Sequence, residues 1–244
     1  MTSLDDTFDG RFDGTSDSTF DDTLARIGRL GVVPVVVIDD ARQARRMAET
    51  LAEAGLPGAE LTLRTPAALE AITEVSRVEG FLAGAGTVLT GGQARRAIDA
   101  GAGFLVSPGL SREVVETGRA AGFPVLPGVA TATELITALE LGIDTVKFFP
   151  AAFAGGPGAL RALTLPFPGV RFMPTGGIRP ETLPDYLEIP AVLAVGGTWI
   201  TTPDLVRRGD YGSIGRLARE AASAVVRLRP PRQPDIPSTA RNSS

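Results

Sequence analysis

The chain has 244 residues, a net charge of −4, and neither cysteine nor histidine. This composition excludes disulfides, catalytic cysteine or histidine, and metal sites built from those side chains. The acidic balance also disfavours nucleic acid as a partner, because no surplus of cations is available to bind its phosphates.

The two ends of the chain differ in composition from the rest. Residues 1–19 are rich in Asp, Thr, Ser and Gly, and residues 229–244 are rich in proline and lack periodicity. We expect both to be disordered extensions of one domain at 20–228. The acidic start lacks the features of a signal peptide, and no apolar run approaches the ~20 residues of a membrane span. We therefore expect a cytoplasmic protein without a membrane partner.

Strand-like and helix-like segments alternate through the domain. The first strand is a continuous β-branched run, typical of a strand buried on both faces. Asp39 and Asp40 then offer N-caps to a helix that Gly55 ends, and Thr65 followed by Pro66 is expected to open the next helix. The expected strands cover 32–38, 59–63, 81–86, 103–109, 124–128, 144–150, 170–177 and 191–197.

The alternation predicts a parallel sheet. Eight strand–helix units in ~200 residues fit an α/β fold of the (β/α)₈ TIM-barrel type. A short helix at 24–30 is expected to cover the bottom of the barrel. The alternative, an open Rossmann-like sheet, is weaker because no GxGxxG motif follows the first strand.

Lys147 is the only lysine among 24 Lys and Arg residues. It lies in the sixth strand, on the same face as Thr145 and Phe149. If this face points into the barrel, loss of solvent favours the neutral amine, which is a nucleophile and can form a Schiff base as arginine cannot. The alternative is a lysine at a strand end whose amine reaches the solvent.

The second strand carries a second set of polar side chains on one face. Glu60, Thr62 and Arg64 alternate with apolar residues, so all three are expected to point inward. A carboxylate beside an arginine suits a general acid/base next to a carboxylate-binding group. The alternative is a structural ion pair between Glu60 and Arg64.

Two glycine pairs follow the seventh and eighth strands. Gly176 and Gly177 come after Thr175, and Gly196 and Gly197 come before Thr198. In barrels, loops at these two strand ends often bind phosphate through backbone N–H groups. A single Gly-Gly pair also occurs in ordinary tight turns, but two at adjacent strand ends favour a phosphate site.

These segments together resemble the family of 2-keto-3-deoxy-6-phosphogluconate (KDPG) aldolases, also called 4-hydroxy-2-oxoglutarate aldolases. The match covers nearly all of residues 31–228 and keeps the family's order. One departure is Ala152, where many members have a glutamate; this position lies outside the matched catalytic set. The matching segments are VVPVVVI, ELTLRT, GAGTVL, SPGL, PGVAT, VKFFPA, PTGGI and VGGTW.

The resemblance implies a class I aldolase that forms a homotrimer and needs no metal or other cofactor. Its implied reaction cleaves KDPG to pyruvate and glyceraldehyde 3-phosphate, in the Entner–Doudoroff pathway, and 4-hydroxy-2-oxoglutarate to pyruvate and glyoxylate. Lys147 matches the Schiff-base lysine and Glu60 the proton-shuttling carboxylate. The residues that match substrate-binding groups are Arg64 and Thr87 for the pyruvate carboxylate, Pro108 and Phe149 for the pocket walls, Thr175 near the aldehyde end, and Gly176, Gly177, Gly197 and Thr198 for the phosphate.

Three alternatives remain open. The preferred substrate could be the galactonate-derived sugar acid instead of the gluconate-derived one. A barrel transferase or isomerase would use Lys147 only as a charge and would not trap pyruvate. A non-catalytic barrel would bind sugar phosphates and release no pyruvate.

Overall fold

The computed structural model of the chain describes residues 18–230. The disorder expected for 1–17 and 231–244 concerns residues outside this range. Helix α1 (Ser18–Leu30) already begins inside the expected N-terminal extension. At the other end, the guanidinium of Arg229 donates hydrogen bonds to three backbone carbonyls. The folded unit is therefore slightly longer at both ends than the composition predicts.

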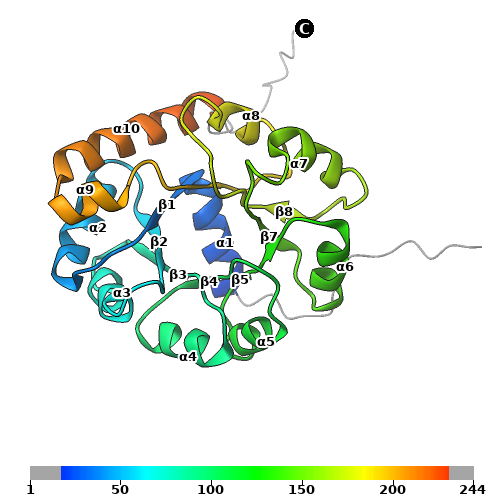
Figure 1. The fold of residues 1–244 in the computed structure, drawn as a ribbon, viewed down its shortest axis with the longest axis horizontal. Helices are drawn as coiled ribbons and strands as arrows, with labels where there is room; N and C mark the ends of the chain where they lie inside the picture. Colours follow the sequence, from blue (N-terminus) through cyan, green and yellow to red (C-terminus); the bar gives the residue numbers. More distant parts are fainter. Residues whose placement is uncertain (1–17, 231–244) are drawn as a thin grey trace, which may run out of the picture.

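The strands form a closed parallel barrel (Figure 1). Backbone pairing gives the orders β5-β4-β3-β2-β1-β9 and β6-β7-β8. Only Pro127 separates β5 from β6, so these two form one barrel strand. Bridges from Phe172 to Val192 and from Thr175 to Gly196 join β8 to the β9 segment. The strands are β1 Val32–Val36, β2 Gly58–Thr62, β3 Leu82–Gly86, β4 Phe104–Val106, β5 Val125–Leu126, β6 Gly128–Val129, β7 Thr145–Phe148, β8 Arg171–Phe172 and β9 Val195–Gly197.

The (β/α)₈ barrel is thus confirmed, and the open sheet is wrong. The remaining helices surround the strands as an outer ring (Figure 1). No helix among residues 18–230 is both long and apolar enough to cross a membrane. The ring contains η1 Ala41–Gln43, α2 Ala44–Glu53, α3 Ala68–Ser76, α4 Gly91–Asp99, α5 Arg112–Ala120, α6 Ala132–Glu140, α7 Gly156–Thr164, α8 Leu183–Leu187, α9 Pro203–Arg208 and α10 Tyr211–Leu228.

Two local features differ from the expectation. Helix α3 begins at Ala68, so Thr65 and Pro66 do not open it; the Thr65 hydroxyl donates instead to the carbonyl of Ile38. Helix α8 was expected only as part of the seventh strand–helix unit, without a position, and α9 was not expected. They have five and six residues, which is too short for a helical period to show in the sequence.

Helix α1 covers the bottom of the barrel, inside the ring of outer helices (Figure 1). Its Leu24, Ile27 and Leu30 pack against inward side chains from the strands, which confirms the expected capping helix. This apolar cluster fills the lower interior, so the polar inward side chains lie above it. Its strand-side members are Val33, Leu82, Phe104, Val106, Leu126, Met173 and Ala194.

Candidate active site

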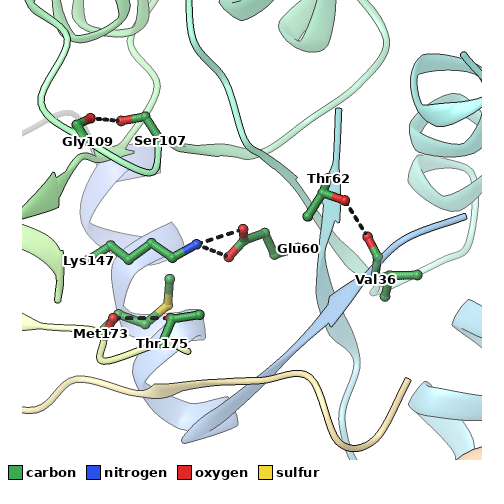
Figure 2. Close-up of polar contacts among 8 residues, drawn as sticks. All are labelled: Val36, Glu60, Thr62, Ser107, Gly109, Lys147, Met173 and Thr175. Carbon is green, nitrogen blue, oxygen red and sulfur yellow. Dashed lines mark hydrogen bonds and ion pairs between the residues drawn. The ribbon is translucent and has the colours of Figure 1, made fainter. Parts of the chain in front are cut away.

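Lys147 from β7 and Glu60 from β2 meet inside the barrel (Figure 2). The Nζ atom of Lys147 lies 3.0 Å from Oε1 and 3.3 Å from Oε2 of Glu60. Lys147 is 5% exposed and Glu60 is 0% exposed. The inward orientation predicted for both side chains is therefore observed, and the alternative in which the amine reaches the solvent is wrong.

The surroundings of this pair compensate the burial of two charges. The carboxylate accepts from the ammonium group, and the centroid of the Phe149 ring lies 5.2 Å from Nζ. Among the described residues, every buried side-chain nitrogen and oxygen has a hydrogen-bond partner. A buried ion pair with good geometry is tolerated, but removal of one partner leaves an uncompensated charge.

Arg64 does not pair with Glu60, so the structural ion pair considered above is wrong. β2 ends at Thr62, and Arg64 lies exposed in the turn that follows it. Its side chain makes no ion pair with any other residue of the range 18–230. Thr62 stays inside, where its hydroxyl donates to the carbonyl of Val36 at 3.0 Å (Figure 2). Of the three inward candidates on β2, only Glu60 therefore contacts Lys147.

Two glycines leave the space that the polar side chains occupy. A β-carbon at Gly86 on β3 would overlap Oε1 of Glu60, and one at Gly196 on β9 would overlap Oγ1 of Thr175. The Thr175 side chain is buried, and its hydroxyl donates to the carbonyl of Met173 at 3.3 Å (Figure 2). Glycine is required at both positions because a neighbouring side chain lies where a β-carbon would be, and not because of the backbone conformation.

Thr87 adopts a backbone conformation that is rare for its type. It follows β3 directly and has a φ of 55°, in the left-handed region, the only such non-glycine residue in the described part of the chain. A β-branched side chain is disfavoured there, and such strain is concentrated at functional sites. Thr87 is partly exposed, at the same end of the barrel as the carboxylate of Glu60.

The loop that carries Pro108 is fixed by two contacts. The buried hydroxyl of Ser107 donates to the carbonyl of Gly109 at 2.7 Å (Figure 2). A β-carbon at Gly128 would overlap the carbonyl of Pro108, so the two backbones touch there. No role was predicted for the Ser107 hydroxyl, although SPGL is one of the segments that carry the family resemblance.

The loops after β7 and β8 are bound to each other. The amide of Ala151 donates to the carbonyl of Thr175 at 2.8 Å, and the amide of Ala152 donates to that of Gly176 at 3.0 Å. Gly176 and Gly177 have φ values of 101° and 74°, which favour glycine. Ala152, the position that departs from the resemblance, therefore packs beside this loop and carries no charge.

The eighth strand brings its glycine pair to the same end. Gly197 is buried beside the ring of Trp199, and Thr198 is exposed. Among residues 18–230 no group of three or more Asp and Glu side chains is arranged to hold a metal ion. Lys147 and Glu60 thus lie within their strands, the other site residues predicted from the sequence lie at or after strand ends, and of all these side chains only those of Lys147 and Glu60 are joined to each other by a hydrogen bond.

Comparison with known proteins gives the same family as the resemblance seen in the sequence. The family model for KDPG and KHG aldolases matches residues 24–217. The 2-dehydro-3-deoxy-phosphogluconate aldolase of Pseudomonas aeruginosa is 44% identical over 201 residues, which cover 82% of this chain and 90% of that protein.

Solved structures agree with this similarity. The KDPG aldolase of Zymomonas mobilis ZM4 with 3-phosphoglycerate is 44% identical, with a TM-score of 0.76, over 82% of this chain and 95% of that one. The KDPG aldolase of Legionella pneumophila, with pyruvate captured at low pH as a covalent carbinolamine intermediate, is 39% identical, with a TM-score of 0.78, over 82% and 97%.

Proposed function

The chain belongs to the KDPG and KHG aldolase family, and we propose that it cleaves KDPG to pyruvate and glyceraldehyde 3-phosphate through a Schiff base on Lys147. It is a class I aldolase, a carbon–carbon lyase. The observation that carries the proposed roles is the buried contact of 3.0 Å between Nζ of Lys147 and Oε1 of Glu60. This contact supplies a nucleophile and a proton acceptor within direct transfer distance.

The first half of the reaction forms the iminium ion. The ammonium group of Lys147 transfers a proton to Glu60, and the neutral amine attacks the C2 ketone of the substrate to give a carbinolamine. Glu60 returns the proton to the departing hydroxyl, which leaves as water. The resulting iminium withdraws electrons from C3, and Glu60 is again a carboxylate.

The second half breaks the carbon–carbon bond. Glu60, directly or through a water, removes the proton from the C4 hydroxyl, and the electrons of the C3–C4 bond move into the iminium. Glyceraldehyde 3-phosphate leaves, and a pyruvate enamine remains on Lys147. Glu60 then protonates C3 of the enamine, and water hydrolyses the iminium to release pyruvate. The same steps convert 4-hydroxy-2-oxoglutarate to pyruvate and glyoxylate, which agrees with the family's description.

The remaining residues bind the two ends of the substrate in this proposal. Arg64 has no ion-pair partner among residues 18–230, so its guanidinium is available to the pyruvate carboxylate. We assign the strained Thr87 to the same carboxylate. At the other end, close-packed glycine loops let backbone N–H groups approach a phosphate. We assign Pro108 and Phe149 to the pocket walls, Thr175 to the aldehyde end, and Gly176, Gly177, Gly197 and Thr198 to the phosphate.

The family also supports proposals about the setting of the reaction. We propose a homotrimer that acts in the cytoplasm in the Entner–Doudoroff pathway, with no metal or other cofactor. Phe153 and Leu165, which flank α7, are 85% and 82% exposed, and such large apolar side chains are candidates for a subunit interface. Light scattering during gel filtration tests the trimer.

Trapping with borohydride tests the proposed function. Reduction in the presence of pyruvate should add one reduced pyruvate to the chain, and because Lys147 is the only lysine, a lysine adduct identifies it without ambiguity. In a lactate-dehydrogenase-coupled assay, KDPG should release pyruvate. The variant Lys147→Arg should do neither, since guanidinium stays protonated and forms no imine. Pyruvate release by this variant at the normal rate would refute the assignment.

A further inference from the structure

Three threonine hydroxyls donate to carbonyls at the end of β1 and just beyond it. Thr62 on β2 donates to Val36, Thr65 after β2 donates to Ile38, and Thr201 after β9 donates to Val35. Thr62 and Thr65 come from the neighbour on one side of β1. Thr201 follows β9, on the other side of β1, where Gly197 and Thr198 also lie. These two residues are assigned to the phosphate, whereas Thr201 is not among the residues assigned to the substrate.

The Thr201 hydroxyl replaces backbone pairing that β9 does not continue. β9 pairs with β1 over Val32–Pro34 and ends at Gly197. Carbonyls two or four residues apart along a parallel strand face the same neighbour, and that of Gly31 accepts from Val195 of β9. The carbonyl of Val35 therefore also faces β9, beyond its end, and accepts from Oγ1 of Thr201 at 3.1 Å.

This hydrogen bond fixes the loop 198–200 at its second end. The first end is held by the pairing of Gly197 with Pro34. Thr201 is 1% exposed, and Ile200 before it is fully buried, whereas Thr198 is exposed. The loop is thus anchored at both ends and presents its first residue to solvent.

The anchor point on β1 is also paired with the catalytic strand. Val35 is the register partner of Glu60 on β2. One residue of β1 therefore connects the Glu60 position on one side to the Thr201 hydroxyl on the other. The separation between the Glu60 carboxylate and the Gly197–Thr198 segment depends on this connection.

We propose that Thr201 is a positioning residue, which holds Gly197 and Thr198 at the distance from Glu60 that a phosphorylated substrate requires. The proposal rests on the proposed function. Without the hydroxyl, the carbonyl of Val35 loses its partner and the loop 198–200 is anchored at one end only. Such a change weakens binding of the phosphate end and leaves the chemistry at Lys147 intact.

The test compares a phosphorylated substrate with one that lacks phosphate. In Thr201→Val, which keeps the shape but not the hydroxyl, we expect KM for KDPG to rise about tenfold with kcat within about twofold. We expect kcat/KM for 4-hydroxy-2-oxoglutarate to stay within about twofold. Thr201→Ser retains the hydroxyl and should restore the KM for KDPG.

Thr65→Val is the matched control, because it removes a hydroxyl that donates to Ile38, just beyond the end of β1, on the side away from the phosphate segment. Its ratio of kcat/KM for the two substrates should equal that of the wild type. Equal losses on both substrates in Thr201→Val, no loss, or a serine variant as impaired as the valine variant would overturn the proposal. If Thr201→Val does not fold, Thr201→Ala is measured by the same ratio. A wild-type chain that cleaves neither substrate and traps no pyruvate would reject the proposed function itself.

Discussion

The Nζ atom of Lys147 and Oε1 of Glu60 lie 3.0 Å apart although 87 positions separate the two residues in the chain. Closure of the barrel brings them together, because β2 and β7 are not neighbours in either sheet and their inward side chains meet across the interior. The apolar cluster beneath them, with α1 below, keeps water from the lower side of the pair. Within the described residues, the apolar cluster thus separates the two polar groups from the end of the barrel that α1 covers.

Substitution of the carboxylate should separate proton transfer from folding. Glu60→Gln keeps the size of the side chain but cannot accept a proton, so we expect kcat to fall about 10²–10⁴-fold. The exchange of pyruvate methyl protons with deuterium oxide, which needs protonation and deprotonation at C3, should fall with it. NMR of pyruvate measures this exchange, and Glu140→Gln, on the exposed side of α6, is the control. Exchange at the wild-type rate in Glu60→Gln would assign the proton shuttle to another group.

The space left by Gly86 should be as important as the carboxylate that fills it. In Gly86→Ala the new methyl group would overlap Oε1 of Glu60 and displace it from Lys147. We expect a fall in kcat of about tenfold or more and a loss of about 1–3 kcal/mol of stability. Gly158→Ala is the matched control, because a β-carbon there meets no atom and alanine favours the helix α7. Coupled assays and urea unfolding of both variants make the comparison; unchanged kcat in Gly86→Ala would contradict it.

Much of this arrangement could be predicted from local sequence. The β-branched run at the first strand and the alternation around Lys147 and Glu60 indicate buried strands and the faces of their side chains, because both depend only on near neighbours. The partner of Glu60 could not be predicted in this way. Arg64 shares its alternation, but the strand ends before Arg64, and the pairing with Lys147 depends on which strands face each other after closure.

Features without a local signature were also missed. The hydroxyl of Thr201 finds the carbonyl of Val35 across 166 positions, and nothing in the sequence around either residue indicates it. Thr65 and Pro66 are residue types that often open a helix, yet the Thr65 hydroxyl donates instead to the carbonyl of Ile38, just after the first strand. In both cases a hydrogen bond to a distant part of the chain determines the role of the threonine, because the residue type alone is compatible with several local structures.

The N-terminus of α6 should give the fold a measurable pH dependence. Oε2 of Glu134 accepts from the amides of Ala130 and Thr131 and from the hydroxyl of Thr131, at 2.8–2.9 Å. Partial burial acts to raise the pKa of Glu134, but these hydrogen bonds outweigh it and lower the pKa. Because the folded pKa is below the unfolded one, the stabilisation is complete above the unfolded pKa and is lost as the pH falls through the folded pKa.

We therefore expect Glu134→Gln to lower the free energy of unfolding by about 0.5–1 kcal/mol at pH 7, a small value because the carboxylate is partly exposed and screened. The difference from the wild type should shrink as the pH falls below about 4.5, the ordinary value for this group. Urea unfolding at a series of pH values measures it. Glu140→Gln, on the same helix, should show no such loss, and a difference that grows at low pH would contradict the sign.

Arg229 should determine where the chain can be shortened. Its guanidinium donates to the carbonyl of Leu187, the last residue of α8, and to those of Val192 and Leu193, which precede β9. Burial lowers the pKa of Arg229. Arg229→Ala leaves these carbonyls without that donor, so we expect a loss of about 2–3 kcal/mol of stability. Arg229→Lys should recover only part of it, because an ammonium group lacks the planar fork. Since these contacts lie at the end of the barrel opposite the site, kcat below the melting temperature should not change.

Two truncated chains test the same contacts. A chain that ends at Leu228 should be as unstable as Arg229→Ala, whereas one that ends at Pro230 should match the full chain in urea unfolding. Equal stability of the two truncated chains would show that Arg229 does not hold this end.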